Sequence, residues 1–162
     1  MSSATVMLSG GQDSTTCLYW ALTKFSHVEA IGFDYGQKHL VELEAAQKIC
    51  HNLSICYTII DLKDVFANSS LVDSQQDISA QHTINPDLPS SFTAGRNAVF
   101  LSVTAGLAYN KSINDIVTGV CQTDHSGYPD CRRIFIDSME KSLSLALDSE
   151  IKIHTPLMYL TK

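Results

Sequence analysis

Ser9-Gly10-Gly11-Gln12-Asp13-Ser14 links a short apolar run, Thr5-Val6-Met7-Leu8, to residues 14–25, whose apolar side chains recur at helical spacing. A glycine pair between a strand and a helix lets the backbone approach an anion closely, and the N–H groups of the first helical turn point toward that anion. The stretch therefore predicts a phosphate-binding loop, with triphosphate as the expected anion. An ordinary strand-to-helix turn with Ser14 as the N-cap is the alternative.

The loop lacks the lysine of a Walker A motif and the three-glycine spacing of a dinucleotide fingerprint. It resembles the SGGxDS loop of the PP-loop ATP pyrophosphatases. The resemblance implies that the loop binds the pyrophosphate half of ATP while a substrate attacks the α-phosphate, and that Asp13 holds Mg²⁺. The residues expected to bind ATP are Leu8, Ser9, Gly10, Gly11, Gln12, Asp13, Ser14 and Thr15.

Predicted strands and helices alternate along the chain. Strands are expected at 5–8, 28–33, 55–60, 115–120 and 151–154, and helices at 14–25, 38–53, 97–109 and 131–147. This βαβ repetition predicts an α/β fold in one domain, residues 1–162, with a doubly wound parallel sheet and helices on both faces. Ligands in such sheets bind at the carboxyl ends of the strands, where the glycine loop also lies.

The polar, proline-interrupted residues 68–89 are predicted to form a long irregular loop. The composition, 44% hydrophobic and 17% charged, is that of an ordinary globular domain. A net charge of -6 argues against a broad nucleic-acid-binding surface and favours a small-molecule substrate. The longest mostly apolar stretch, residues 98–109, is too short to span a bilayer, so we expect a soluble cytoplasmic protein without a membrane partner.

The five cysteines are odd in number and form no Cys-x-x-Cys pair. This pattern fits neither a disulfide framework nor a standard zinc knuckle, so free thiols are expected. Cys17 and Cys50 fall on apolar helical faces and are expected in the core.

Arg96 opens a predicted helix in the segment Gly95-Arg96-Asn97. As a planar donor it could lie beside ATP phosphates or a substrate carboxylate. A solvated arginine near a helix start is the alternative, and the helix dipole disfavours a cation there.

Residues 119–132 follow a predicted buried strand and are crowded with polar and aromatic groups, which is typical of a heterocycle pocket. Asp124 or Asp130 could accept hydrogen bonds from the guanidine-like edge of a guanine analogue, Gln122 could pair with its amide, and Tyr128 could stack on it. The alternatives are two plain turns, with Asp130 as the N-cap of the next helix. His125 is expected at the surface.

The chain resembles the QueC family of queuosine biosynthesis, the 7-cyano-7-deazaguanine synthases, over segments 8–17, 33–39, 41–46, 95–97, 118–124, 126–132 and 155–162. The glycine loop marks only the superfamily, whereas Tyr35-Gly36 and Gly127-Tyr128-Pro129-Asp130-Cys131 make the match specific. The resemblance implies an ATP-dependent ligase that converts 7-carboxy-7-deazaguanine and ammonia to the nitrile through an acyl-adenylate. Arg96 and Lys162 would stabilise charge beside Asp13 and Mg²⁺, and no side-chain nucleophile is required.

Members of the family continue beyond the position of Lys162 with four cysteines that bind a structural zinc. This chain has no cysteines in that spacing, so no zinc ligand is assigned, and we expect a fragment, a truncated reading frame or a natural short variant. Two functional alternatives stay open: another PP-loop ligase that modifies tRNA, and a non-catalytic nucleotide-binding or regulatory protein. The oligomeric state is also open, with a homodimer as one expectation.

Overall fold

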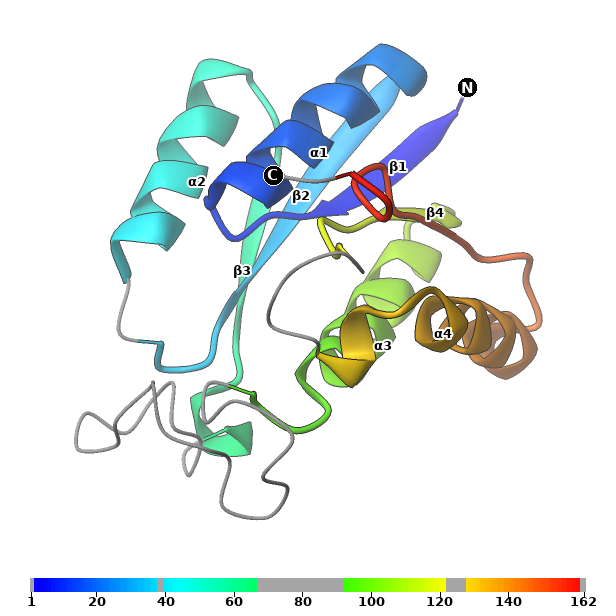
Figure 1. Ribbon diagram of the computed structural model, residues 1–162. Helices are drawn as coiled ribbons and strands as arrows, with labels where there is room; N and C mark the ends of the chain where they lie inside the picture. The colour runs from blue at the N-terminus through cyan, green and yellow to red at the C-terminus, as the bar shows by residue number, and fades with distance from the viewer. Residues whose placement is uncertain (1, 38–39, 67–91, 122–127, 161–162) are drawn as a thin grey trace.

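A parallel sheet of five strands forms the centre of the molecule (Figure 1). The computed structural model describes residues 2–37, 40–66, 92–121 and 128–160. The strands lie in the order β3-β2-β1-β4-β5, and every neighbouring pair is parallel. Their bounds are β1 Ser3–Met7, β2 His27–Asp34, β3 Tyr57–Asp61, β4 Asp115–Val117 and β5 Lys152–His154.

Helices cover both faces of the sheet, two on each side (Figure 1). On one face lie α1 (Gln12–Lys24) and α2 (Leu40–Asn52), and on the other α3 (Arg96–Tyr109) and α4 (Arg133–Leu147). Two short 3₁₀ helices, η1 (Lys63–Val65) and η2 (Pro129–Cys131), complete the regular structure of the described ranges. This architecture confirms the expected doubly wound α/β fold. Within those ranges, no helix combines the length and apolar character needed to cross a membrane.

Alternating side chains of β1 divide the interior into two cores, because successive residues of a strand point to opposite faces. Val6 and Leu8 pack with the buried residues Cys17 and Leu18 of α1. Met7 points the other way and packs with α3 and α4. Strands buried on both faces are mainly apolar, and the mainly apolar sequences of β1 and β2 made them recognisable. Cys17 and Cys50 are core residues as expected, with 0% and 1% of their surface exposed.

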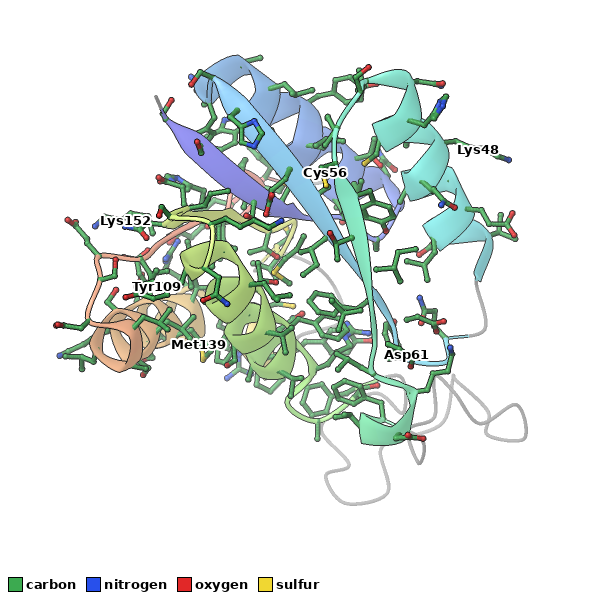
Figure 2. All side chains as sticks on the ribbon, turned by 180° about the vertical axis from the view of Figure 1, so that it is seen from behind. Lys48, Cys56, Asp61, Tyr109, Met139 and Lys152 are labelled. Carbon is green, nitrogen blue, oxygen red and sulfur yellow. The ribbon has the colours of Figure 1, made fainter. Side chains whose placement is uncertain are left out.

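Strand β3 is an edge strand, and its exposed side lies uncovered in the view from behind (Figure 2). Cys56, labelled beside the start of β3 in Figure 2, is exposed and carries a free thiol. The opposite edge is the short strand β5.

Two predicted elements are shorter in the structure than in the sequence pattern. The strand expected over 115–120 ends at Val117, although Thr118 N–H still donates to the carbonyl of His154 in β5. Residues 118–121 then line a cavity. The helix expected from Cys131 begins at Arg133, after η2, whose first residue is Pro129. The irregular loop predicted for 68–89 lies outside the described residues.

The strand order reverses direction at β1, which has β2 on one side and β4 on the other. In open parallel sheets this reversal leaves a crevice outside the carboxyl ends of the two diverging strands. The segment after β1 is the predicted phosphate loop, and the segment after β4 begins the predicted heterocycle pocket. The topology therefore brings the two sequence motifs to one place.

Candidate nucleotide and base site

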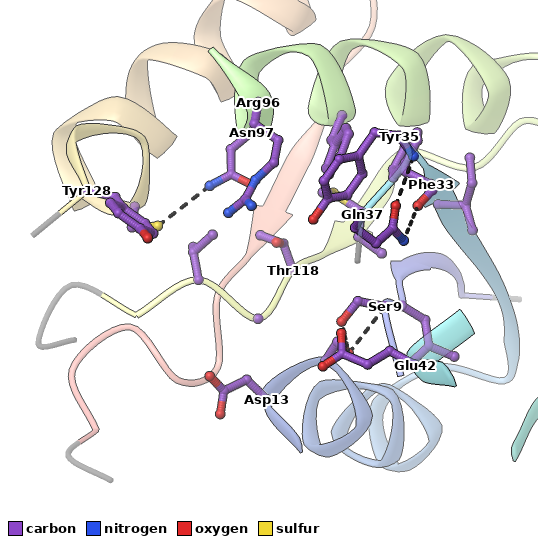
Figure 3. Close-up of a pocket in the computed structure, with 18 of the residues that line it drawn as sticks. Ser9, Asp13, Phe33, Tyr35, Gln37, Glu42, Arg96, Asn97, Thr118 and Tyr128 are labelled. Carbon is purple, nitrogen blue, oxygen red and sulfur yellow. Dashed lines mark hydrogen bonds between the residues drawn. The ribbon is translucent and has the colours of Figure 1, made fainter. Parts of the chain in front are cut away.

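A cavity of about 330 Å³ opens at the carboxyl ends of β1, β2 and β4 (Figure 3). Ser9 and Asp13 lie on one side of it, and Arg96 and Tyr128 lie on the other (Figure 3). The strands and loops that contribute these side chains are far apart in the sequence, so the cavity exists only in the folded chain. Its two sides differ chemically, since one is a polar loop at a helix start and the other is largely aromatic.

The phosphate loop is shaped by Gly10, whose φ is +92°, a region that side chains disfavour. A Cβ atom at Gly10 would also overlap the carbonyl oxygen of Glu42, in the first turn of α2. The loop therefore packs directly against α2, and only glycine fits there. Glu42 also lines the cavity, beside the loop (Figure 3).

Two serine hydroxyls tie the loop together. Ser9 N–H donates to Ser14 Oγ at 3.2 Å, the two hydroxyl oxygens are 3.0 Å apart, and Ser14 Oγ donates to the Gly11 carbonyl at 3.1 Å. Helix α1 begins at Gln12 with Gly11 as its N-cap, so Ser14 stands inside the first turn and the N-cap alternative for it is wrong. The first-turn N–H groups of a helix have no acceptor within the helix, and they carry its positive dipole end. The loop therefore fits a phosphate group.

Asp13 stands in the first turn of α1 and lines the cavity. One turn further, the thiol of Cys17 lies 3.7 Å from the carbonyl oxygen of Thr118, which joins α1 to the segment after β4. Burial, and then the charge of Asp13, raise the pKa of Cys17 to about 12. The cysteine is thus a protonated packing group behind the site. A single carboxylate together with phosphate oxygens is a common Mg²⁺ arrangement, and Asp13 fits that requirement.

An aromatic wall closes the second side of the cavity. The rings of Phe33 and Phe100 are stacked, with centroids 4.1 Å apart, and Tyr35 contacts Phe100 at 5.5 Å. The side chain of Gln37 holds this turn, because its Oε1 accepts from Tyr35 N–H and its Nε2 donates to the Phe33 carbonyl. The guanidinium carbon of Arg96 lies 5.9 Å from the centroid of the Tyr35 ring, which is within cation–π range.

Arg96 is the first residue of α3, and Gly95 before it has φ +69°. The start of α3 is joined to η2 by two hydrogen bonds: Asn97 N–H donates to Asp130 Oδ2, and Asn97 Nδ2 donates to the Asp130 carbonyl, both at 3.1 Å. The buried Asp130 carboxylate thus accepts from a first-turn N–H group and caps the start of α3. The expected role of Asp130 as N-cap of the following helix is wrong, since Arg132 occupies that position.

The predicted site residues are placed as follows. Leu8, Ser9, Asp13, Ser14, Arg96 and Tyr128 line the cavity, while Gly10, Gly11, Gln12 and Thr15 form the adjoining loop and helical turn. Asp130 lies behind Asn97, outside the cavity lining. Gln122, Asp124 and Lys162 lie outside the described residues, as does His125.

Sequence reasoning gave no site role to the aromatic wall or to Glu42, Asn97 and Cys121, which also line the cavity. The signal for the wall was present, because Tyr35-Gly36-Gln37 directly follows β2 and therefore stands at the ligand edge of the sheet. Within the described ranges, no three His, Cys, Asp or Glu side chains gather closely enough to hold a metal ion by themselves.

Comparison with known proteins identifies the family of the chain. A family model described as "Queuosine biosynthesis protein QueC" matches residues 3–162. A 7-cyano-7-deazaguanine synthase from Laribacter hongkongensis is 47% identical over 161 residues, which are 98% of this chain and 70% of the relative. A 7-cyano-7-deazaguanine synthase from Clostridium botulinum is 49% identical, over 98% of this chain and 73% of the relative.

The fold is also similar to that of a U34-tRNA thiolase from Methanococcus maripaludis, with a TM-score of 0.62. That likeness covers 99% of this chain and 53% of the thiolase at 18% identity, so it bears on the fold alone. The match over residues 3–162, together with the identity to the two synthases, shows that the chain belongs to the QueC family of queuosine biosynthesis proteins.

Proposed function

We propose that this chain is an ATP-dependent carbon–nitrogen ligase that converts 7-carboxy-7-deazaguanine and ammonia to 7-cyano-7-deazaguanine. The observation that carries the proposal is a phosphate loop, Ser9–Ser14, facing an aromatic wall across one cavity in a member of this family. Close relatives named 7-cyano-7-deazaguanine synthase support the assignment of the substrate.

The chemistry requires activation, because a carboxylate is a poor electrophile until one of its oxygens becomes part of a leaving group. Attack of the base carboxylate on the α-phosphate of ATP forms an acyl-adenylate and releases pyrophosphate. Ammonia then attacks the acyl carbon and AMP departs, which leaves an amide. A second activation of the amide oxygen permits its elimination to the nitrile.

On the nucleotide side, the amides of the loop and of the first turn of α1 would hold the phosphates, with Ser9 and Ser14 hydroxyls beside them. Asp13 would hold Mg²⁺, which when bound neutralises charge on the phosphate oxygens. Arg96, on the opposite side of the cavity, would stabilise negative charge that develops during transfer, and Lys162 is proposed for the same task. This chain positions groups and supplies charge, and it needs no nucleophile of its own.

On the base side, Tyr128 would stack on the heterocycle, and its ring already contacts Phe92 with centroids 5.7 Å apart. Asp130 uses Oδ2 for Asn97, whereas its buried Oδ1 has no hydrogen-bond partner among the described residues. The carboxylate lies behind Asn97 and outside the cavity lining, so the proposed role of Asp130 as an acceptor for the amino edge of the base requires access past Asn97. Gln122 and Asp124 are proposed to complete this recognition.

The proposed partners are small molecules, namely the base, ATP and ammonia, and no nucleic acid is proposed as a partner. The proposed setting is the cytoplasm. A homodimer is one oligomeric state to test. The zinc expected for the family is given no step here, because no ligand for it has been found among the described residues.

Formation of the adenylate is testable by exchange of labelled pyrophosphate into ATP. We expect exchange that depends on both 7-carboxy-7-deazaguanine and Mg²⁺, since release of pyrophosphate is reversible while the acyl-adenylate stays bound. The Asp13→Asn variant should lose the exchange, and guanine, which has no carboxylate, should not support it. Binding of MgATP without base-dependent exchange would instead favour the non-catalytic alternative.

A further inference from the structure

Tyr57, at the start of the edge strand β3, reaches across the neighbouring strand to the end of β1. Its register partner on β2 is Ala30, so its side chain runs diagonally over Gly32, two residues further along. Its Oη donates a hydrogen bond to the carbonyl oxygen of Leu8, with the two oxygens 3.0 Å apart. A residue of the sheet edge thus contacts the residue that precedes the phosphate loop.

Gly32 makes this contact geometrically feasible. A Cβ atom at Gly32 would overlap Tyr57 Oη and would lie 2.7 Å from Tyr57 Cζ. Because a side chain at that position would occupy the path of the phenol, the glycine and the tyrosine form a matched pair. Neither residue received a role in the sequence analysis.

The Leu8 carbonyl needs a donor other than the backbone N–H groups of the described residues. Strand β1 pairs with β2 as far as Met7 and Ile31, and Leu8 N–H still donates to the Ile31 carbonyl at 2.8 Å. Leu8 is only 1% exposed, so water cannot readily satisfy its carbonyl. Burial raises the pKa of Tyr57 above its ordinary value, which keeps the hydroxyl protonated and able to donate.

We propose that Tyr57 is a positioning residue for nucleotide binding, holding the Leu8 carbonyl and thereby the direction in which the chain enters the loop Ser9–Ser14. This inference rests on the proposed function, since it takes the ligand of the loop to be ATP. Two residues after Leu8, the loop is also held by the contact of Gly10 with α2. Loss of the Tyr57 hydroxyl would free one of these two anchors.

The expected effect is selective for one ligand. Leu8 and Ser9 line the cavity at the phosphate loop, whereas Tyr128 and Arg96, the first residue of α3, lie across the cavity from Ser9 (Figure 3). A shift of the loop therefore weakens phosphate binding and leaves the base side in place. A purely structural role would instead lower stability with no change in the affinity of the folded protein for either ligand.

Tyr57→Phe removes only the hydroxyl. Isothermal titration calorimetry should give a Kd for MgATP about tenfold weaker than that of the parent chain, which is about 1.4 kcal/mol. The Kd for 7-carboxy-7-deazaguanine should stay within about twofold, near the resolution of such comparisons. Tyr19→Phe is the matched control, because Tyr19 is 51% exposed on α1, and it should leave both constants unchanged.

Gly32→Ala provides a second route to the same displacement. It should weaken MgATP binding to a similar degree. In the double variant Gly32→Ala/Tyr57→Phe the loss of MgATP affinity should be less than the sum of the two single losses, because both substitutions remove the same hydrogen bond from Tyr57 to Leu8. An unchanged Kd for MgATP in Tyr57→Phe, or equal weakening of both ligands, would overturn the positioning role while the proposed function stands. Failure of the parent chain to bind MgATP would overturn both.

Discussion

Replacing Asp130 with alanine should lower the free energy of unfolding by about 2 kcal/mol. Asp130 is 7% exposed, and its Oδ2 accepts from Asn97 N–H at the first turn of α3. Loss of a helix-capping acceptor costs about 1 kcal/mol. The buried N–H of Asn97 would then have no acceptor from that side chain, which adds a cost of similar size.

Urea denaturation followed by circular dichroism measures this directly, provided that the slope with denaturant is unchanged. For a chain of this length the melting temperature should fall by roughly 4–8 °C. Asp130→Asn keeps an oxygen that can accept from Asn97 and should recover about half of the loss. Asp137→Ala is the matched control, because Asp137 pairs with Arg133 at the surface of α4 and should cost less than about 0.5 kcal/mol. If Asp130→Ala were no more destabilising than Asp137→Ala, the capping role would be refuted.

The remaining predictions concern a half-buried ion pair, the proposed metal ligand and the thiols. Lys111→Met should cost about 2 kcal/mol in urea denaturation, because Glu29, 8% exposed and 2.8 Å from Lys111 Nζ, would lose its cation and keep only the hydrogen bond from Thr5 Oγ1; no loss would contradict this. Asp13→Asn should abolish turnover and preserve the circular dichroism spectrum, and undiminished turnover would remove Asp13 from the metal role. Iodoacetamide at pH 8 should label the exposed Cys56 and spare Cys17, whose pKa is raised to about 12, until urea unfolds the chain; early labelling of Cys17 in mass spectra would contradict its burial.

Much of the fold follows from local pattern. Residues 14–25 show helical spacing, and the structure has α1 at Gln12–Lys24. Residues 28–33 form a β-prone, mainly apolar run interrupted by Glu29, and β2 spans His27–Asp34, because a strand buried on both faces needs apolar residues without strict alternation. The predicted alternation of strands and helices was enough to indicate a parallel sheet and the edge at which ligands bind.

Element boundaries depend on contacts that no local pattern contains. The strand predicted for 115–120 ends at Val117, where the chain turns toward the cavity. Helix α4 begins at Arg133, after η2, with Arg132 as its N-cap, and Asp130 accepts instead from Asn97 N–H, 33 positions earlier in the sequence. Periodicity cannot show a hydrogen bond between residues that distant.

In the candidate site, too, local pattern was predictable and long-range contacts were not. The loop Ser9–Ser14 could be recognised because its glycines and serines are consecutive and precede a helix. The contact of Tyr35 with Arg96 could not be recognised, since the two residues meet only in the folded chain, where Phe33 of β2 stacks on Phe100 of α3. The link from Tyr57 to Leu8 spans 49 positions and depends on a glycine that the sequence pattern presents as an ordinary strand residue.

The most direct test is a product assay with the 162-residue chain. The chain is incubated with ATP, Mg²⁺, ammonium and 7-carboxy-7-deazaguanine, the base is followed by mass spectrometry, and one of the full-length synthases serves as the positive control. We expect the amide and then the nitrile to appear, with release of pyrophosphate. An unchanged carboxylate, while the full-length synthase is active in parallel, would contradict the proposed ligase activity of this chain.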